Sequence, residues 1–167
     1  MPGHPDEAEA QLRAAARGDD PVYVRLSNQS DARPLAPDGG PGFRVLRRGG
    51  AATVLAVGPL ADTALAATEG LDVTVPYAAT VRPFDAATLR AALTDQADAD
   101  VVLAEPYLAG TSAGEVAEAL GDRPHRLLSL GVARDEARGY GTPRRHAVAH
   151  DLGSADMRLH ISRFLRS

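Results

Sequence analysis

Residues 110–114 read G-T-S-A-G and match the G-x-S-x-G pattern that places a catalytic serine at a sharp turn in α/β-hydrolases. Asp and His residues follow downstream, in the order of a Ser-acid-His triad. Such a serine must lie at the tip of a strand, whereas the strand expected here ends near Glu105, seven residues earlier. The pattern therefore favours a glycine-rich loop leading into a helix, with Ser112 near its cap, where an anion could also bind.

A second candidate for chemistry is the pair His146 and His150, spaced i, i+4 with Asp151 adjacent. On a helix this pair could hold a metal ion, because imidazoles one turn apart point the same way. There is no H-E-x-x-H pattern, no third ligand is evident, and Pro143 and Gly153 on either side give little support for a helix. The pair is therefore interpreted as surface or interface histidines.

Gly58 stands between an apolar strand and a helix, as in phosphate-binding turns. Pro59 follows it and removes one of the N–H donors that a phosphate site would use. Proline also suits the first helical position, so we expect a tight strand-to-helix turn. The pairs at 47–48 and 144–145 are interpreted as solvated turn arginines.

Composition excludes several mechanisms within this 167-residue chain. All 18 basic residues are arginine and there is no cysteine, which excludes lysine Schiff bases, P-loop lysines, disulfides, thiolate nucleophiles and cysteine metal sites. The net charge of −4 gives no electrostatic reason to expect nucleic acid. The N-terminus is polar and acidic, and no apolar run could span a bilayer, so we expect a cytoplasmic protein with no membrane partner.

The elements that must position these residues alternate along the chain. Apolar spacing predicts a helix over 6–17 and a strand over 21–26, and residues 27–42 are then rich in Pro, Gly and Asp. Beyond them we expect strands at 43–46, 52–57, 71–75, 101–105 and 125–130, and helices at 58–68, 85–97, 112–120 and 154–165, the last capped by Ser154. This alternation predicts an α/β fold, a three-layer structure with a mainly parallel sheet and helices on both faces.

From residue 51 onward the order of segments resembles the C-terminal domain of the transketolase family of thiamine diphosphate enzymes. The quoted stretches are ATVLAVG (52–58), TVRPFD (80–85, similar to the family's T-h-K-P-h-D), VVLAE (101–105), GEVAEAL (114–120), LGV (130–132) and HDL (150–152). HPDEAE (4–9) and DPVYVRLS (20–27) look like the last helix and strand of that family's pyrimidine-binding domain. The resemblance implies a pyrimidine-domain tail (1–30), a linker (31–42) and a transketolase C-terminal-like domain (43–167).

The resemblance implies an enzyme of three domains, of which this chain holds one and part of another. The family's G-D-G motif, which holds the diphosphate and metal, is absent here, as is most of the pyrimidine-binding domain. We therefore expect one subunit of a split enzyme that transfers a two-carbon ketol unit. Thiamine diphosphate and Mg would be held mainly by partner subunits carrying the diphosphate-binding and pyrimidine-binding domains, in a hetero-oligomer. This chain alone would be inactive and would contribute no catalytic, cofactor or metal residue.

One position departs from the family pattern. Sugar-phosphate transketolases read L-S-R-Q where this chain has L-S-N-Q, so Asn28 replaces the arginine that grips the substrate phosphate. A neutral amide cannot make the bidentate, charge-assisted bonds of a guanidinium, which indicates a substrate without phosphate at that end. Arg25 or a partner could instead take over. The substrate-binding candidates are Asn28, Arg25 and Gln29.

Three other functions stay open. The same domain occurs in deoxyxylulose phosphate synthases and in the β subunits of 2-oxoacid dehydrogenases, so the transferred group could be an acyl group. The chain could also be a degenerate, non-catalytic binding module. The hydrolase suggested by Ser112 is the last alternative.

Overall fold

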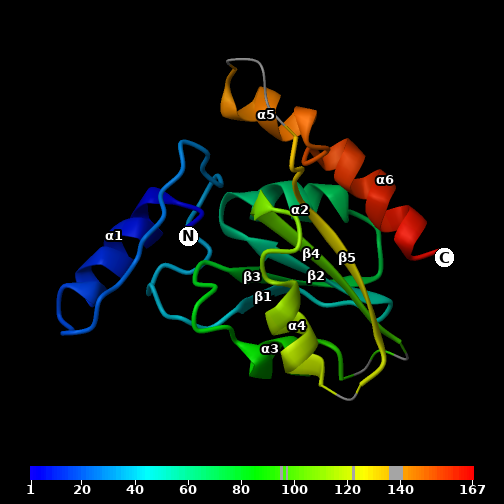
Figure 1. Ribbon diagram of the computed structural model, residues 1–167, viewed down its shortest axis with the longest axis horizontal. Helices are drawn as coiled ribbons and strands as arrows, with labels where there is room; N and C mark the ends of the chain where they lie inside the picture. The colour runs from blue at the N-terminus through cyan, green and yellow to red at the C-terminus, as the bar shows by residue number, and fades with distance from the viewer. Residues whose placement is uncertain (95, 97, 122, 136–140) are drawn as a thin grey trace.

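The computed structural model describes residues 1–167 except positions 95, 97, 122 and 136–140 (Figure 1). Its helices are α1 (Pro5–Ala15), η1 (Gly58–Leu60, a 3₁₀ turn), α2 (Ala61–Ala67), α3 (Ala86–Ala92), α4 (Ala113–Leu120), α5 (Pro143–Ala149) and α6 (Ser154–Phe164). Its strands are β1 (Arg44–Arg47), β2 (Ala52–Val57), β3 (Val73–Ala78), β4 (Ala99–Leu108) and β5 (His125–Val132). None of these described helices is both long and apolar enough to cross a membrane.

The five strands form one sheet in the order β1-β3-β2-β4-β5. Strands β3, β2, β4 and β5 are parallel, and only β1 is antiparallel to its neighbour. In the centre, Thr53 of β2 pairs with Thr74 of β3 on one side and with Val101 of β4 on the other. Parallel neighbours require crossover connections, and the intervening helices supply them.

Alternate residues of each strand enter two separate cores, one on either face of the sheet. Val54 of β2 lies in the core with Met157 and Ile161 of α6, and Leu55 lies in the core with Leu89 of α3. Figure 1 shows α2 on one side of the sheet and α3 and α4 on the opposite side. This three-layer arrangement confirms the predicted α/β fold with a mainly parallel sheet and helices on both faces.

The predicted elements from residue 43 onward are confirmed in position, and the differences lie at their ends. Strand β2 has its expected bounds, whereas β4 and β5 run beyond their predicted ends. Helix α3 stops at Ala92, and positions 95 and 97 of the longer predicted helix lie outside the described residues. Gly153, not Ser154, is the N-cap of α6, so the predicted cap was wrong by one residue.

The structure also differs from what the sequence favoured at two further places. Helix α5 contains His146 and ends before its C-cap, His150, and its start is marked by Thr142, which accepts from the N–H of Arg145, followed by Pro143. Those are ordinary helix-start signals that outweigh the nearby glycine. Arg47 lies in β1 instead of a solvated turn, and its guanidinium donates to Thr68 Oγ1.

The N-terminal segment is formed only in part. Helix α1 is present, but Glu7 is its only buried residue, and in Figure 1 the helix stands apart from the sheet. The strand predicted over 21–26 is not formed, and the segment pairs with none of the described strands. Residues 31–42 contain no helix or strand, as a linker would, yet Ala36 is fully buried in the core beside α2.

Candidate functional site

A surface hollow of about 1110 Å³, called the larger hollow because it exceeds a second hollow described below, lies among the described residues at the carboxyl ends of β3, β4 and β5. The N-terminal segment supplies the other wall, through α1 and residues 20–25. Ligands of open α/β sheets bind outside the carboxyl ends of the strands, where the loops diverge. The hollow is therefore the candidate functional site.

Arg25 and Tyr107 join the two walls. The Arg25 guanidinium carbon lies 5.0 Å from the centroid of the Tyr107 ring, within the range of a cation–π contact. Burial raises the pKa of Tyr107 to about 12, although the nearby Arg25 acts in the opposite direction. Tyr107 therefore stays a neutral phenol at physiological pH and can act there as a hydrogen-bond donor.

Glu105 and Ser112 lie beneath this wall. Glu105 is fully buried near the end of β4, and its Oε2 accepts a hydrogen bond from the N–H of Ser112 at 3.3 Å. Its Oε1 is buried without a hydrogen-bond partner among the described residues. Burial is the main cause that raises the pKa of this carboxyl, with the Ser112 hydrogen bonds acting in the opposite direction. The carboxyl group of Glu105 thus takes up an N–H group at the start of α4 that a bound anion would otherwise use, so we no longer expect an anion to bind there.

Arg82, in the loop after β3, contacts the start of α4. Its guanidinium forms an ion pair with Glu115 at 2.5 Å and donates to Ser112 Oγ at 3.4 Å. Ser112 is buried as the N-cap of α4, so the helix cap expected from the sequence is confirmed. It lies four residues beyond the end of β4. Its contacts with an arginine and a glutamate do not form a Ser-acid-His arrangement.

The predicted substrate-binding residues are divided between two hollows. Arg25 lines the larger one, whereas Asn28 and Gln29 line a second hollow of about 640 Å³ against α1. Asn28 is exposed, and the N–H of Gln29 donates to Ser27 Oγ at 3.0 Å. Within this chain the structure therefore does not bring the three residues together.

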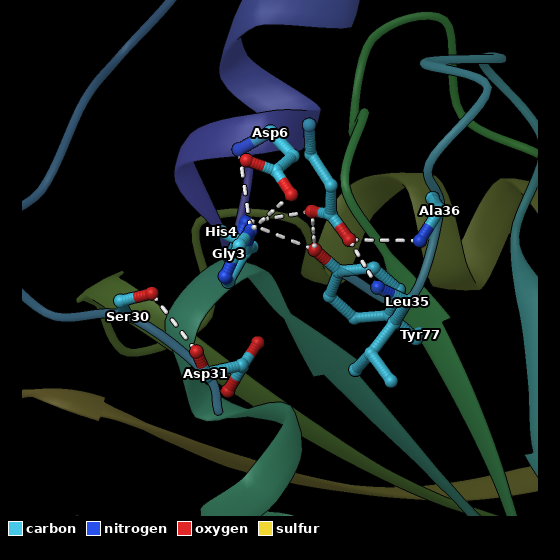
Figure 2. Close-up of polar contacts among 9 residues, drawn as sticks. Gly3, His4, Asp6, Ser30, Asp31, Leu35, Ala36 and Tyr77 are labelled. Atoms are coloured by element: carbon cyan, nitrogen blue, oxygen red, sulfur yellow. Dashed lines mark hydrogen bonds and ion pairs between the residues drawn. The ribbon is translucent and has the colours of Figure 1, made fainter. Parts of the chain in front are cut away.

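A buried polar cluster ties α1 to the sheet and positions the wall of the larger hollow. The carboxylate of Glu7 accepts hydrogen bonds from the N–H groups of Leu35 at 2.5 Å, Ala36 at 2.7 Å and Gly3 at 3.0 Å, and from the Tyr77 hydroxyl (Figure 2). Burial alone would raise the pKa of Glu7, but the hydrogen bonds from Tyr77 and the amides prevail and lower it. Glu7 is therefore held as a buried anion.

Asp31 lies beside this cluster and titrates differently. Its Oδ1 accepts from the N–H of Asp62 at 3.1 Å, and its Oδ2 is buried without a partner among the described residues. Burial is the main reason that its pKa is raised to about 7, and the negative charges of Asp62 and Glu7 act in the same direction. The cluster thus holds one ionised carboxylate and one carboxyl that is protonated near neutrality.

The paired histidines occupy neither hollow. Asp151 lies 3.6 Å from Nε2 of His160, which belongs to α6. In the part of the chain that the structure describes, no three His, Cys, Asp or Glu side chains gather to hold a metal ion.

Three functional candidates were missed from the sequence. Tyr107 was missed because the strand was expected to end at Glu105, although β4 extends to Leu108. Arg82 stands in the T-V-R-P-F-D stretch quoted above, but nothing in the pattern showed that it would reach Ser112. In the sequence, Glu7 is an ordinary acidic residue in the first turn of a helix. Its burial depends on contacts with Leu35 and Tyr77, which lie 28 and 70 positions further along the chain.

The fold is an α/β domain with a mainly parallel sheet covered by helices on both faces, and its candidate site lies at the carboxyl ends of the strands. The sequence matches the family described as "Transketolase, C-terminal domain" over residues 42–151. The chain belongs to that family.

Two known proteins are similar to nearly the whole chain. A curated protein from Rhodococcoides fascians, "Uncharacterized 33.6 kDa protein in fasciation locus", is 49% identical over 166 residues, which are 99% of this chain and 53% of that protein. A solved structure, "Split gene transketolase, inactive beta4 tetramer", superposes with a TM-score of 0.80 at 26% identity, over 99% of this chain and 56% of its own. The chain spans about half the length of both proteins that it matches.

Proposed function

We propose that this chain is the C-terminal subunit of a split, thiamine diphosphate-dependent transketolase-like enzyme that transfers a two-carbon ketol unit. The observation that carries the proposal is coverage: 99% of the chain matches a split-gene transketolase chain, but only 56% of that chain is matched. Under this proposal, a partner polypeptide would supply the part of the enzyme equivalent to the unmatched part of that chain. The family membership over residues 42–151 supports the same assignment.

Partner subunits would carry the diphosphate-binding and pyrimidine-binding domains and would hold thiamine diphosphate and Mg. The cofactor supplies the reactive carbon, while the protein around it supplies binding and orientation. The neighbour named an inactive tetramer supports the proposal that this chain is inactive without partners. Residues 1–30 would then complete the pyrimidine-binding domain of the partner.

The contribution of this chain to the reaction would be one wall of the acceptor channel. The hollow lined by Arg25 and Tyr107 opens at the carboxyl ends of the strands and offers a cation, a neutral phenol and apolar surface. Asn28 and Gln29 would contact substrate only when a partner closes the second hollow over them. Asn28 in place of an arginine supports an acceptor without a phosphate at that end.

Reconstitution tests the proposal. The isolated chain should bind no thiamine diphosphate by calorimetry, and the chain co-purified with partners from the same genome should transfer a ketol unit from a ketose donor. Transfer of an acyl group from a 2-oxoacid donor would favour the dehydrogenase-like alternative. Tight cofactor binding by the isolated chain would contradict the split arrangement, and a partner complex with neither activity would favour a binding module.

A further inference from the structure

The larger hollow carries a guanidinium that no carboxylate of the described chain neutralises. Arg25 lines the hollow, and its guanidinium carbon lies 5.0 Å from the centroid of the Tyr107 ring. The ion pairs among the described residues do not include Arg25. Arg82, the other arginine of this lining, is paired with Glu115 at 2.5 Å. Because a cation–π contact leaves the N–H donors of a guanidinium without an acceptor, those of Arg25 are available to a ligand.

The hydroxyl of Tyr107 is a second donor on the same wall. The side chain is half-buried at the end of β4, and its hydroxyl has no hydrogen-bond partner among the described residues. Burial raises the pKa of Tyr107 to about 12, so the phenol keeps its proton at physiological pH. A neutral phenol donates a hydrogen bond to an anion, whereas an ionised one would repel it. Arg25 and Tyr107 together therefore favour an anionic ligand.

The rest of the wall is mostly apolar. It is formed by alanines of α1, by Val22 and Val24 of the N-terminal segment, and by Leu108 and Val132 at the ends of β4 and β5. Ligand pockets of this kind bind an apolar body by burial and orient it with a few polar groups. A sugar would need hydrogen-bond partners for the hydroxyl groups that leave water, and this wall supplies few. The hollow therefore fits a ligand with one anionic end and an apolar body.

The start of α4 distinguishes a carboxylate end from a phosphate end. Phosphates are commonly held by the free N–H groups at a helix N-terminus. Here the N–H of Ser112 donates to Glu105 Oε2 at 3.3 Å, and the guanidinium of Arg82 beside it is already paired with Glu115. The donors that remain are the guanidinium of Arg25 and the hydroxyl of Tyr107. Neighbouring donors of this kind match both oxygens of a carboxylate.

We propose that the larger hollow binds an organic carboxylate with an apolar or aromatic body, whose carboxylate accepts hydrogen bonds from the Arg25 guanidinium and the Tyr107 hydroxyl. The body would lie against the apolar wall between the N-terminal segment and the ends of β4 and β5. The acceptor of the two-carbon unit would then itself be such a carboxylate, and this part of the inference rests on the function proposed above. An acceptor of this kind also agrees with Asn28, which offers a phosphate no charge.

A nuclear magnetic resonance titration of the full chain provides the first test. The probe is phenylacetate, and phenylacetamide is the neutral probe of the same shape. Phenylacetate should shift the amide signals of residues 22–25 and 106–108 in a saturable way, and phenylacetamide should bind about tenfold more weakly. No shift at millimolar phenylacetate, or equal affinity for the two probes, would overturn the proposal. Tighter binding of benzyl phosphate than of phenylacetate would identify a phosphate site and overturn it as well.

Substitutions at the two donors provide the second test. Arg25→Gln should weaken phenylacetate binding by about tenfold or more and leave phenylacetamide binding unchanged, because only the charge is lost. Tyr107→Phe keeps the ring and should weaken phenylacetate binding about fivefold. Arg17→Gln is the matched control, since this exposed arginine lines neither hollow. An equal loss in Arg17→Gln would show that overall charge, and not the hollow, attracts the probe. Thermal melts check that each variant folds.

The complex with partner subunits separates this inference from the proposed function. Phenylacetate should still bind in the complex, and loss of binding there would show that the partner fills the hollow, which overturns the proposal. Binding in the hollow without ketol transfer supports the site and contradicts the enzyme assignment. A complex that transfers a ketol unit with equal kcat/KM to a carboxylate-bearing acceptor and to its amide, and that binds no phenylacetate, overturns the site and leaves the enzyme assignment intact.

Discussion

The hydroxyl of Tyr77, on β3, donates a hydrogen bond to the carboxylate of Glu7, on α1, across 70 positions of sequence. Both side chains are fully buried. The same carboxylate accepts from the N–H groups of Leu35 and Ala36, so one anion joins the N-terminal helix, the segment 31–42 and the sheet. The position of α1, and with it one wall of the candidate site, depends on this group.

Glu7→Gln should lower the free energy of unfolding by about 2 to 4 kcal/mol. The amide keeps the shape of the side chain, but its NH₂ group would face N–H or O–H donors that the carboxylate now accepts. Urea denaturation measures the loss. Glu9→Gln is the matched control on the same helix, where the exposed pair with Arg13 should be worth about 0.5 kcal/mol or less. Equal effects of the two substitutions would contradict a central role for Glu7.

Asp31 should make the protein less stable as pH rises toward neutrality. Its pKa is 3.8 in the reference state and about 7 in the folded protein, so folding takes up a proton between these values. The free energy of unfolding then falls as pH increases from about 4 to 7, by up to about 4 kcal/mol, because each unit of pKa shift is worth about 1.4 kcal/mol. Asp31→Asn should flatten this slope in urea melts between pH 5 and pH 8.

Asp38→Asn is the control for that pH dependence. Asp38 is an exposed carboxylate whose pKa is lowered, mainly by the hydrogen bond from Arg44. Asp38 therefore contributes to the free energy of unfolding at neutral pH, and this contribution is lost only as pH falls below the ordinary titration range of a carboxyl group. That range lies below the pH 5 to 8 window in which the Asp31 variant is tested. A slope that changes equally in both variants would show that Asp31 is not its source.

Asn28→Arg should shift acceptor preference in the reconstituted enzyme toward phosphorylated sugars. A restored guanidinium offers a phosphate two parallel, charge-assisted hydrogen bonds that an amide cannot make. We expect kcat/KM for a phosphorylated acceptor to rise by about tenfold relative to the unphosphorylated one. Asn28→Gln, which restores length without charge, is the control. A wild-type preference for phosphorylated acceptors would refute the interpretation of Asn28.

Ser112→Ala tests the remaining hydrolase alternative. The wild-type chain should hydrolyse p-nitrophenyl esters no faster than buffer, because the hydrogen-bond partners of Ser112 in the described part of the chain include Arg82 and Glu105 but no histidine that could act as its base. The substitution should cost about 1 kcal/mol of stability through the lost hydrogen bond to the hydroxyl. Measurable esterase activity that disappears in the variant would restore the hydrolase hypothesis.

Two glycine-to-alanine substitutions should act in opposite directions. A Cβ at Gly49 would lie 2.4 Å from the backbone N of Val73, so β3 would have to move, at a cost of about 1 to 3 kcal/mol. A Cβ at Gly114, in the first turn of α4, meets nothing within 4 Å. Gly114→Ala should therefore stabilise the protein by about 0.5 to 1 kcal/mol, because it restricts the unfolded chain and favours the helix. Thermal melts of both variants decide the sign.

The fold was predictable because the strands of the C-terminal domain are short apolar runs separated by turns. Residues 52–57 could be assigned without error since all six are buried and the adjoining Gly and Pro mark the end of the run. The segment 21–26 has equally strong strand composition, yet no strand forms. The strand propensity of a segment shows that it can adopt an extended conformation. A β-strand forms only where another strand lies beside it to accept and donate the backbone hydrogen bonds.

The candidate site was less predictable than the fold. Arg25 was identified by its position in a resembling motif, but its contact is with Tyr107 rather than with Asn28. The partners of Glu7, Glu105 and Arg82 come from distant elements, and no spacing rule in the sequence records which side chains a tertiary fold brings together. The sequence thus located the strands and loops that bear the site, and only the three-dimensional structure showed their contacts.

The open backbone of residues 22–26 has a consequence for how cells must make this protein. A newly synthesised chain exposes a segment of strand composition with apolar side chains and unpaired backbone groups, which can pair with an exposed sheet edge and so promotes aggregation. If the split arrangement proposed above is correct, synthesis coupled to that of the partner polypeptide would remove that hazard. We therefore expect the yield of soluble chain to depend on the ratio at which the two genes are expressed.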